Sequence, residues 1–298
     1  MLLRIAPLPR VPAFFIRPPA SLGQLKPRHF IAWKVSSLRL DASQQSPREG
    51  LPRWPSVTSA TGLLRSLDWF GTGVFAVSGS LTAATCGCDV FGCALVGTVT
   101  AVGGGTLRDA LVLNKHPFWV EEWEYLILSV GAALAAFYLW GSLPVGDSQT
   151  IKTQDGGEGT VLQWGDAIGV GAFAVIGAMN GIRANAPFLV SALCGMMTAT
   201  FGGATRDTLL NRPVRILHPY ADVYAPIALA GAAGYLGLRA LTPALQALRI
   251  GVCVIGVVGL RWMAWTQGWR LSYWDLPGQS IVSTREDPRV LRDTGKKE

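Results

Sequence analysis

Two short segments of the chain combine a glycine cluster with an arginine–aspartate pair. Residues 101–110 read AVGGGTLRDA, and residues 199–208 read ATFGGATRDT. A glycine weakens a helix by about 1 kcal/mol relative to alanine, and a charged side chain at membrane depth is costly unless it finds a partner or water. Because the chain carries both features twice, in apolar surroundings, we expect the two segments to form a functional site.

The glycines suggest two roles. A helix that unwinds at Gly103, Gly104 and Gly105 would offer carbonyl groups to a cation and N–H groups to an anion, and it would let a ligand approach the main chain. Gly202 and Gly203 would do the same in the second segment. Alternatively, the glycines only let two helices cross closely, as small residues do in membranes. The sequence leaves both interpretations open.

The charged residues lead to a sharper hypothesis. Neighbours on a helix point about 100° apart, so we predict that Arg108 does not pair with Asp109. We predict instead an exchange of partners, in which Arg108 pairs with Asp207 and Arg206 pairs with Asp109. The alternative places both pairs at solvated ends of their helices.

Three further polar residues are candidates for the site. Asp68 and Asp166 stand directly before apolar runs, where a helix N-cap is favoured over a site for a coupling ion. Ser78 is a candidate ligand in the first copy, where the second copy has Ile176.

We expect no catalytic residue, no metal and no cofactor. The chain has no serine–histidine–acid set, Walker loop, zinc-protease motif or dinucleotide fingerprint. Its five cysteines lie in or beside apolar runs and are expected to be buried apolar residues.

The two segments belong to a longer internal repeat. DWFGTGVFAVSGSL (68–81) aligns with DAIGVGAFAVIGAM (166–179) at an offset of 98, and the same offset superposes the two Arg-Asp pairs. Each copy holds three apolar spans, an odd number, so the second copy must enter the membrane from the opposite side. Inverted repeats of this kind are characteristic of transporters whose site lies at the repeat interface.

Composition supports a membrane protein, since 50% of the residues are hydrophobic and only 15% are charged. A bundle of soluble helices would need more polar faces than the chain offers. We therefore predict an all-α membrane protein with seven transmembrane helices, arranged as two inverted three-helix repeats plus a seventh helix. The predicted helices cover residues 68–86, 89–113, 122–143, 165–182, 186–210, 221–241 and 245–265.

The parts outside the helices differ in character. Residues 1–65 carry ten Lys/Arg and two acidic residues, which is typical of an organellar transit peptide; the alternative is a disordered basic leader. We expect an organelle inner membrane, chloroplast or mitochondrial. The body has no basic patch, so we expect no nucleic acid partner. The predicted divisions are a leader (1–65), a first repeat (66–145), a linker (146–163), a second repeat (164–243), a seventh helix (244–269) and a polar tail (270–298).

The repeated pattern FAVSGSLTAA…DVFGCALVGTVTAVGGGTLRDALV and FAVIGAM…ALCGMMTATFGGATRDTLL resembles a bacterial inner-membrane family built from two glycine-transporter domains. That family is similar in plan to the trimeric intracellular cation channels. The resemblance implies glycine kinks in the second and fifth helices, a homo-oligomer such as a trimer in membrane lipid, and a pore or substrate path within each protomer. The second copy departs from the pattern, since Phe201 replaces the first glycine, which argues against an open, symmetric pore.

Three functions remain to be weighed. The leading hypothesis is a transporter of a small solute, glycine or another small amino acid, with arginine attracting the carboxylate and aspartate or backbone carbonyls holding the ammonium. The alternative is a channel for a monovalent cation such as potassium. The paired charges speak against a third possibility, a membrane scaffold without transport.

Overall fold

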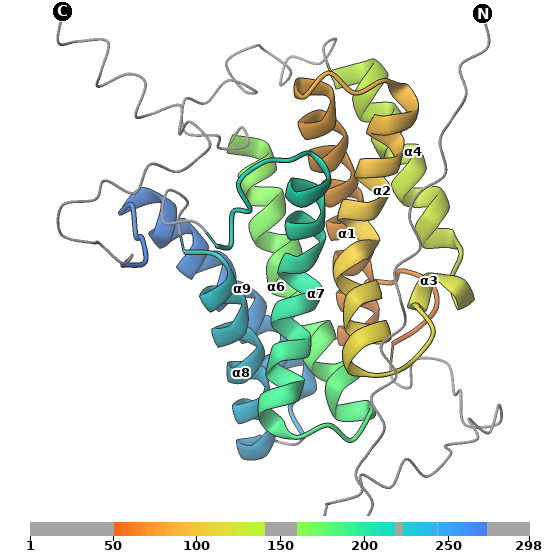
Figure 1. Cartoon of the computed structure of the whole chain (residues 1–298). Helices are drawn as coiled ribbons and strands as arrows, with labels where there is room; N and C mark the ends of the chain where they lie inside the picture. The colour runs from red at the N-terminus through yellow and green to blue at the C-terminus, as the bar shows by residue number, and fades with distance from the viewer. Residues whose placement is uncertain (1–50, 141–159, 218–222, 243, 273–298) are drawn as a thin grey trace, which may run out of the picture. The chain divides into compact units, whose positions relative to one another are not determined.

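A computed structural model describes residues 51–140, 160–217, 223–242 and 244–272, and Figure 1 shows their helices running beside one another. These ranges contain no strand. The helices are α1 (Ala60–Thr85), α2 (Val90–Leu107), α3 (Phe118–Glu121), α4 (Glu124–Leu139), α6 (Thr160–Arg183), α7 (Phe188–Leu209), α8 (Ala225–Leu241) and α9 (Gln246–Thr266), and a π turn, Arg108–Val112, continues α2. Leader residues 1–50, most of the linker and most of the tail lie outside the described residues.

A helix occupies each of the seven ranges predicted from the sequence, but two helices begin earlier than expected. The side chain of Ser59 accepts a hydrogen bond from the Gly62 N–H, so α1 is capped at Ser59 and starts at Ala60. Helix α6 starts at Thr160. Asp68 and Asp166 therefore lie inside their helices, and the prediction that they are N-caps is wrong.

Loops at equivalent places in the two copies close in the same way. Gly87 and Asn185, which are 98 residues apart, both adopt positive φ values, 81° and 55°, after the first helix of each copy. Asn114 and Asn211 do so after the second helix, at 48° and 56°. Glycine and asparagine are the residues that tolerate this left-handed conformation at helix ends.

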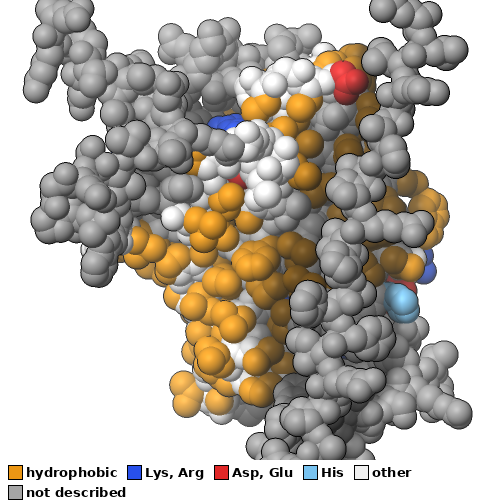
Figure 2. All heavy atoms as spheres, in the orientation of Figure 1, with side chains coloured by type: hydrophobic (Ala, Val, Ile, Leu, Met, Phe, Trp, Pro, Cys, Tyr) orange, Lys and Arg blue, Asp and Glu red, His pale blue; other side chains and the backbone are white. Residues whose placement is uncertain are grey.

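Four stretches of helix among the described residues are long and apolar enough to cross a membrane: Val90–Val112, Val161–Arg183, Phe188–Leu209 and Gln246–Thr266. Helices α4 and α8 are apolar but shorter, at 16 and 17 residues. Large hydrophobic side chains are exposed on these helices, including Phe91, Ile127 and Ile255. Figure 2 shows hydrophobic side chains gathered over the lower part of the visible face, as expected for a surface that meets lipid.

Within each copy, the helices pack through matched glycines. A methyl group on Gly97 would lie 2.7 Å from Ala133 Cβ, and one on Gly195 would lie 2.5 Å from Ala232 Cβ. Both distances are shorter than real Cβ contacts, so the helices approach as closely as the missing side chains allow. This is the packing expected of small residues in membrane helices.

Between the copies, α1 packs against α6 through equivalent residues. A methyl group on Gly71 would lie 3.0 Å from Gly169 Cα, and one on Gly169 would lie 3.3 Å from Gly71 Cα. The rings of Phe75 and Phe173 meet edge to face at 5.3 Å. Both pairs have the offset of 98, so each copy presents the same surface to the other.

Candidate functional site

The glycine clusters lie where α2 crosses α7. A methyl group on Gly104 would lie 2.4 Å from the Thr198 carbonyl oxygen, and one on Gly202 would lie 2.1 Å from the Thr100 carbonyl oxygen. Helix α2 continues without a break through Gly103–Gly105, and α7 is likewise unbroken. Of the two interpretations that the sequence leaves open, the helices are not unwound here, and the glycines let α2 and α7 cross closely.

The backbone departs from the α-helix just after the first cluster, in the π turn. The first copy reads RDALVLNK where the second reads RDTLLNR, one residue fewer. The Leu113 N–H donates to the carbonyl of Arg108, five residues back, whereas the Leu210 N–H donates to the carbonyl of Arg206, four residues back. The π turn therefore absorbs one extra residue in the first copy.

Arg108 is buried and pairs with its own neighbour. Its Nε lies 2.8 Å and its Nη2 2.7 Å from Asp109 Oδ1. Its Nη1 donates to Thr198 Oγ1, 3.0 Å away on α7. Arg108 thus binds aspartate within its own copy and a hydroxyl of the other copy.

Arg206 repeats this arrangement from the second copy. Its Nε lies 2.9 Å from Asp207 Oδ1, and its Nη1 donates to Ser78 Oγ on α1, 3.1 Å away. Ser78, a candidate ligand of the first copy, therefore contacts the arginine of the second copy. Since Ile176 stands at the matching position in the second copy, Arg108 has no such serine and takes Thr198 instead.

The predicted exchange of ion pairs, Arg108 with Asp207 and Arg206 with Asp109, is therefore wrong. The Cβ directions of neighbouring residues do diverge, but an arginine is long enough to fold back so that Nε reaches the adjacent carboxylate. The Nη1 atom of each guanidinium group then reaches the other copy, where a hydroxyl oxygen accepts its hydrogen bond. The solvated alternative is wrong as well, because Asp109 and Asp207 are buried.

The second oxygen of each aspartate holds the loop that follows. Asp109 Oδ2 accepts a hydrogen bond from the Phe118 N–H, and Asp207 Oδ2 accepts one from the Arg215 N–H, both at 3.2 Å. Each carboxylate thus joins its arginine to the start of the next element of its copy.

Asp68 and Asp166 each lie in a buried cluster with a tyrosine and an arginine. In the first copy, the Tyr125 hydroxyl donates to Asp68 and Arg65 Nη1 lies 3.4 Å from it. Arg65 also forms two bonds with Glu122, at 2.6 and 3.0 Å. These residues are fully or largely buried, so the carboxylates balance the arginine where water is scarce.

The second cluster uses a residue from outside the repeat. The Tyr224 hydroxyl lies 2.8 Å from Asp166 Oδ1, and Arg261 Nη2, on α9, lies 3.2 Å from Asp166 Oδ2. The Arg261 guanidinium also stacks over the Tyr224 ring at 4.6 Å. The repeat does not point to either arginine, since Arg65 and Arg261 occupy positions that it does not relate. The two tyrosines, 99 residues apart, are the signal of these clusters that the sequence does carry.

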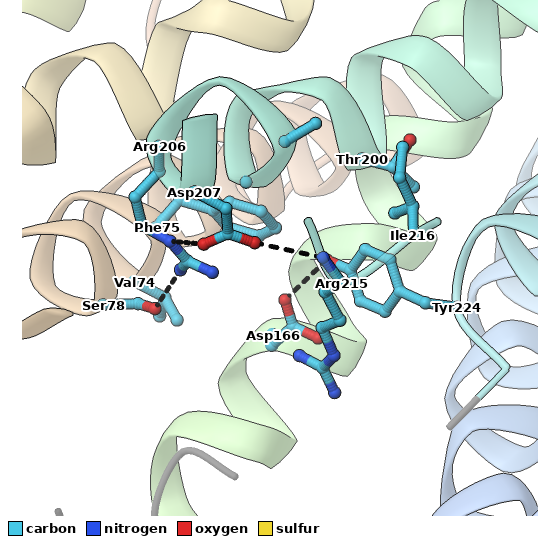
Figure 3. A pocket seen from close by; sticks show the side chains of 12 residues that line it. Val74, Phe75, Ser78, Asp166, Thr200, Arg206, Asp207, Arg215, Ile216 and Tyr224 are labelled. Atoms are coloured by element: carbon cyan, nitrogen blue, oxygen red, sulfur yellow. Dashed lines mark hydrogen bonds and ion pairs between the residues drawn. The ribbon is translucent and has the colours of Figure 1, made fainter. Parts of the chain in front are cut away.

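A cavity lies beside Arg206 (Figure 3), and we call it the Arg206 cavity. Its volume is about 20 Å³, enough for about one or two water molecules. Helices α1, α6 and α7 and the segment before α8 enclose it, so both copies contribute. Its lining residues are Val74, Phe75, Ser78, Asp166, Thr200, Gly203, Ala204, Arg206, Asp207, Arg215, Ile216 and Tyr224.

The charges around the cavity are of both signs. Arg206 and Arg215 provide guanidinium groups, and Asp166 and Asp207 provide carboxylates. Arg215 also stacks over the Tyr224 ring at 4.9 Å. The set can hold water, a small ion or a molecule that carries both charges.

Comparison with known proteins identifies the family. The family model described as Glycine transporter matches residues 65–141 and 163–240. The UPF0126 membrane protein of Deinococcus radiodurans is 32% identical over 220 residues, which cover 74% of this chain and 95% of that protein.

Two solved structures are similar as well. One is the TRIC trimeric intracellular cation channel orthologue from Rhodobacter sphaeroides, with 36% identity and a TM-score of 0.59 over 69% of this chain and 98% of that one. The other comes from work on the structural basis for conductance through TRIC cation channels, with 27% identity and a TM-score of 0.63 over 72% of this chain and 98% of that one. The chain thus belongs to the Glycine transporter family of UPF0126 membrane proteins and is an integral membrane protein with a fold like that of the TRIC channels.

Proposed function

We propose that this protein carries a small solute across a membrane through a path that includes the Arg206 cavity, and that the solute is glycine or another small amino acid. The observation that carries the proposal is the set of charged residues that line the cavity: two arginines, Arg206 and Arg215, and two aspartates, Asp166 and Asp207. Arginine binds a carboxylate with two parallel hydrogen bonds. An ammonium group, in turn, donates hydrogen bonds to carboxylate oxygens. An amino acid with no side chain matches such a set.

Transport requires the cavity to widen, because a volume that fits water is too small for even the smallest amino acid. The contact that must give way is the Arg206 to Ser78 hydrogen bond, which joins the two copies. A solute carboxylate that replaces Ser78 as the acceptor would favour the opened state by its own binding energy.

The membrane arrangement in this proposal is two inverted three-helix repeats, 66–145 and 164–243, joined by the linker 146–163 and followed by a seventh helix, 244–269. The reciprocal contacts between Gly71 and Gly169, and between Phe75 and Phe173, support it. So does the position of the cavity at the interface of the copies, where carriers built from inverted repeats bind their substrates.

A channel for a monovalent cation is the second candidate. It is favoured by the two similar solved structures, both of TRIC cation channels, and by the size of the cavity, which suits an ion better than an amino acid. The trimeric relative also supports a homo-oligomer, a trimer in membrane lipid. The organellar location stays a prediction from the basic leader, and the bacterial relative does not support it.

Reconstitution of the full chain into liposomes tests the two functions. The carrier predicts saturable glycine uptake that is accelerated by glycine inside the vesicle, and the same uptake should fall strongly in Arg206→Gln but not in Arg270→Gln, an exposed control. Potassium conductance that is indifferent to glycine would favour the channel. Vesicles that show neither activity would contradict both.

A further inference from the structure

The Arg206 cavity has an equivalent position in the first copy, beside Arg108, and an aromatic ring fills it. At Gly203, which lines the cavity, the nearest atom to an added methyl group is Arg206 Nη2 at 4.0 Å. At Gly105, 98 residues earlier, an added methyl group would lie only 2.5 Å from Phe118 Cε1. The Phe118 ring therefore packs directly on the first glycine, whereas the second faces open space.

Phe118 and Arg215 hold the same structural position in the two copies. The N–H of each donates to the second oxygen of the aspartate in its own Arg-Asp pair, at 3.2 Å in both cases. Each side chain lies against the tyrosine of its copy: Phe118 meets the Tyr125 ring edge to face at 5.1 Å, and the Arg215 guanidinium lies over the Tyr224 ring at 4.9 Å. The backbone positions match, but one side chain is a phenyl ring and the other a cation.

A second aromatic residue completes the closure in the first copy. Trp119 Nε1 donates to Thr106 Oγ1, 2.9 Å away. Thr106 corresponds, at the offset of 98, to Ala204, which lines the open cavity. Phe118 and Trp119 both belong to the short helix α3, so this one element covers Gly105, which is buried, and bonds Thr106, which is half-buried.

We infer that Phe118 closes a second, latent cavity beside Arg108. Because Arg215 takes the place of Phe118 in the second copy, only the half of the site beside Arg206 is accessible. The ring excludes water from Gly105, while Arg215 leaves Gly203 accessible and adds a charge to the lining. This inference concerns access to the two halves and does not depend on which solute is carried.

Cysteine accessibility in the purified full chain, with no solute added, tests the inference. Cys86 is exposed and Cys88 half-buried, so the expectation of five buried cysteines is wrong for these two. Both are first removed as Cys86→Ser and Cys88→Ser, and then Ala204→Cys and Thr106→Cys are compared as matched positions. With a small methanethiosulfonate reagent, we expect Ala204→Cys to react at least about tenfold faster, because the side chain at 106 lies against Trp119 of α3 and must wait for a local opening, whereas the one at 204 lines the cavity. Adding Phe118→Ala should raise the rate at Thr106→Cys at least about tenfold and leave Ala204→Cys unchanged, while Val120→Ala, an exposed residue of the same helix, should change neither.

The reciprocal variant gives an independent test. Arg215→Phe should slow the reaction of Ala204→Cys by about tenfold by placing a ring against Gly203. The inference is overturned if Ala204→Cys and Thr106→Cys react at equal rates when no further substitution is present. It is also overturned if a folded Phe118→Ala protein leaves the Thr106→Cys rate unchanged, or if Arg215→Phe leaves the Ala204→Cys rate unchanged. Should Phe118→Ala not fold, the Arg215→Phe result decides. Since labelling needs no solute, a failure of transport leaves this result intact.

Discussion

Arg206 and Ser78 are joined by a 3.1 Å hydrogen bond that connects residues 128 positions apart, one from each sequence copy. The Nε atom of the same guanidinium also bonds the carboxylate of Asp207, in its own copy. The arginine is thus balanced in charge by its neighbour and positioned by the opposite copy. Ser78 is therefore a residue of the first copy that helps to orient the Arg206 side chain beside the cavity.

Ser78→Ala should destabilise the protein measurably. It removes the acceptor of a charged donor at a largely buried site, which costs about 1.5–3 kcal/mol in typical proteins. Thr98→Ala is the control, because that hydroxyl bonds only the carbonyl of Ala94 in its own helix. Unfolding in detergent, followed by circular dichroism, measures both variants, and equal stability of Ser78→Ala and the parent would contradict the assigned contact.

Gly202→Ala should be poorly tolerated, whereas Gly234→Ala should be neutral or slightly stabilising. The new methyl group at 202 would lie 2.1 Å from the Thr100 carbonyl oxygen, while the one at 234 meets nothing within 4 Å. Forcing an extra methyl group into packed helices costs about 1–3 kcal/mol, and alanine is otherwise the better helix former. The comparison is made by thermal unfolding, and a mild effect at 202 would show that α2 and α7 do not cross so closely.

Asp166→Asn should destabilise strongly. It leaves Arg261, which is fully buried, without the carboxylate 3.2 Å away, and breaking a buried pair in this way costs about 3–5 kcal/mol. Asp89→Asn is the matched control: Asp89 caps α2, and asparagine caps a helix equally well. If both substitutions shift the unfolding midpoint by similar amounts, the tyrosine–aspartate–arginine cluster does not stabilise the fold as argued.

Deletion of Leu111 should be tolerated. This residue lies in the π turn and is 71% exposed, and its removal lets the turn close as an α-helix, as in the second copy. We expect the melting temperature to change by less than about 4 °C. Deletion of Val102, a buried residue of α2, should abolish folding because it rotates every later residue of the helix. Similar losses for the two deletions would mean that the extra residue is not confined to the turn.

The repeat and the helices can be predicted from the sequence because both depend on patterns along the chain, namely the spacing of matching residues and the length of apolar runs. The offset of 98 identified the matching glycines, and apolar runs located the seven helices. The ion pairs could not be derived in the same way, since the outcome depends on how far a long arginine side chain folds back. The sequence suggests caps at Asp68 and Asp166 because an apolar run begins after each of them, whereas the helices themselves begin at Ala60 and Thr160.

The parts of the site that the sequence did not predict are those that break the symmetry. Arg261 comes from α9, outside both copies, and no repeat comparison points to it. Phe118 and Arg215 share a position only after the one-residue shift in the π turn is taken into account. In the second copy, Arg215 adds a charge to the lining of the cavity. In the first copy, the Phe118 ring fills the equivalent position.

The most direct test of the central claim is protection of Ala204→Cys from thiol labelling by the solute itself. In the background without Cys86 and Cys88, millimolar glycine should slow labelling of this cavity residue in a saturable way, and potassium should not. Protection by potassium alone would assign the cavity to the cation channel. Labelling that neither solute changes would contradict the claim that the Arg206 cavity is part of the solute path.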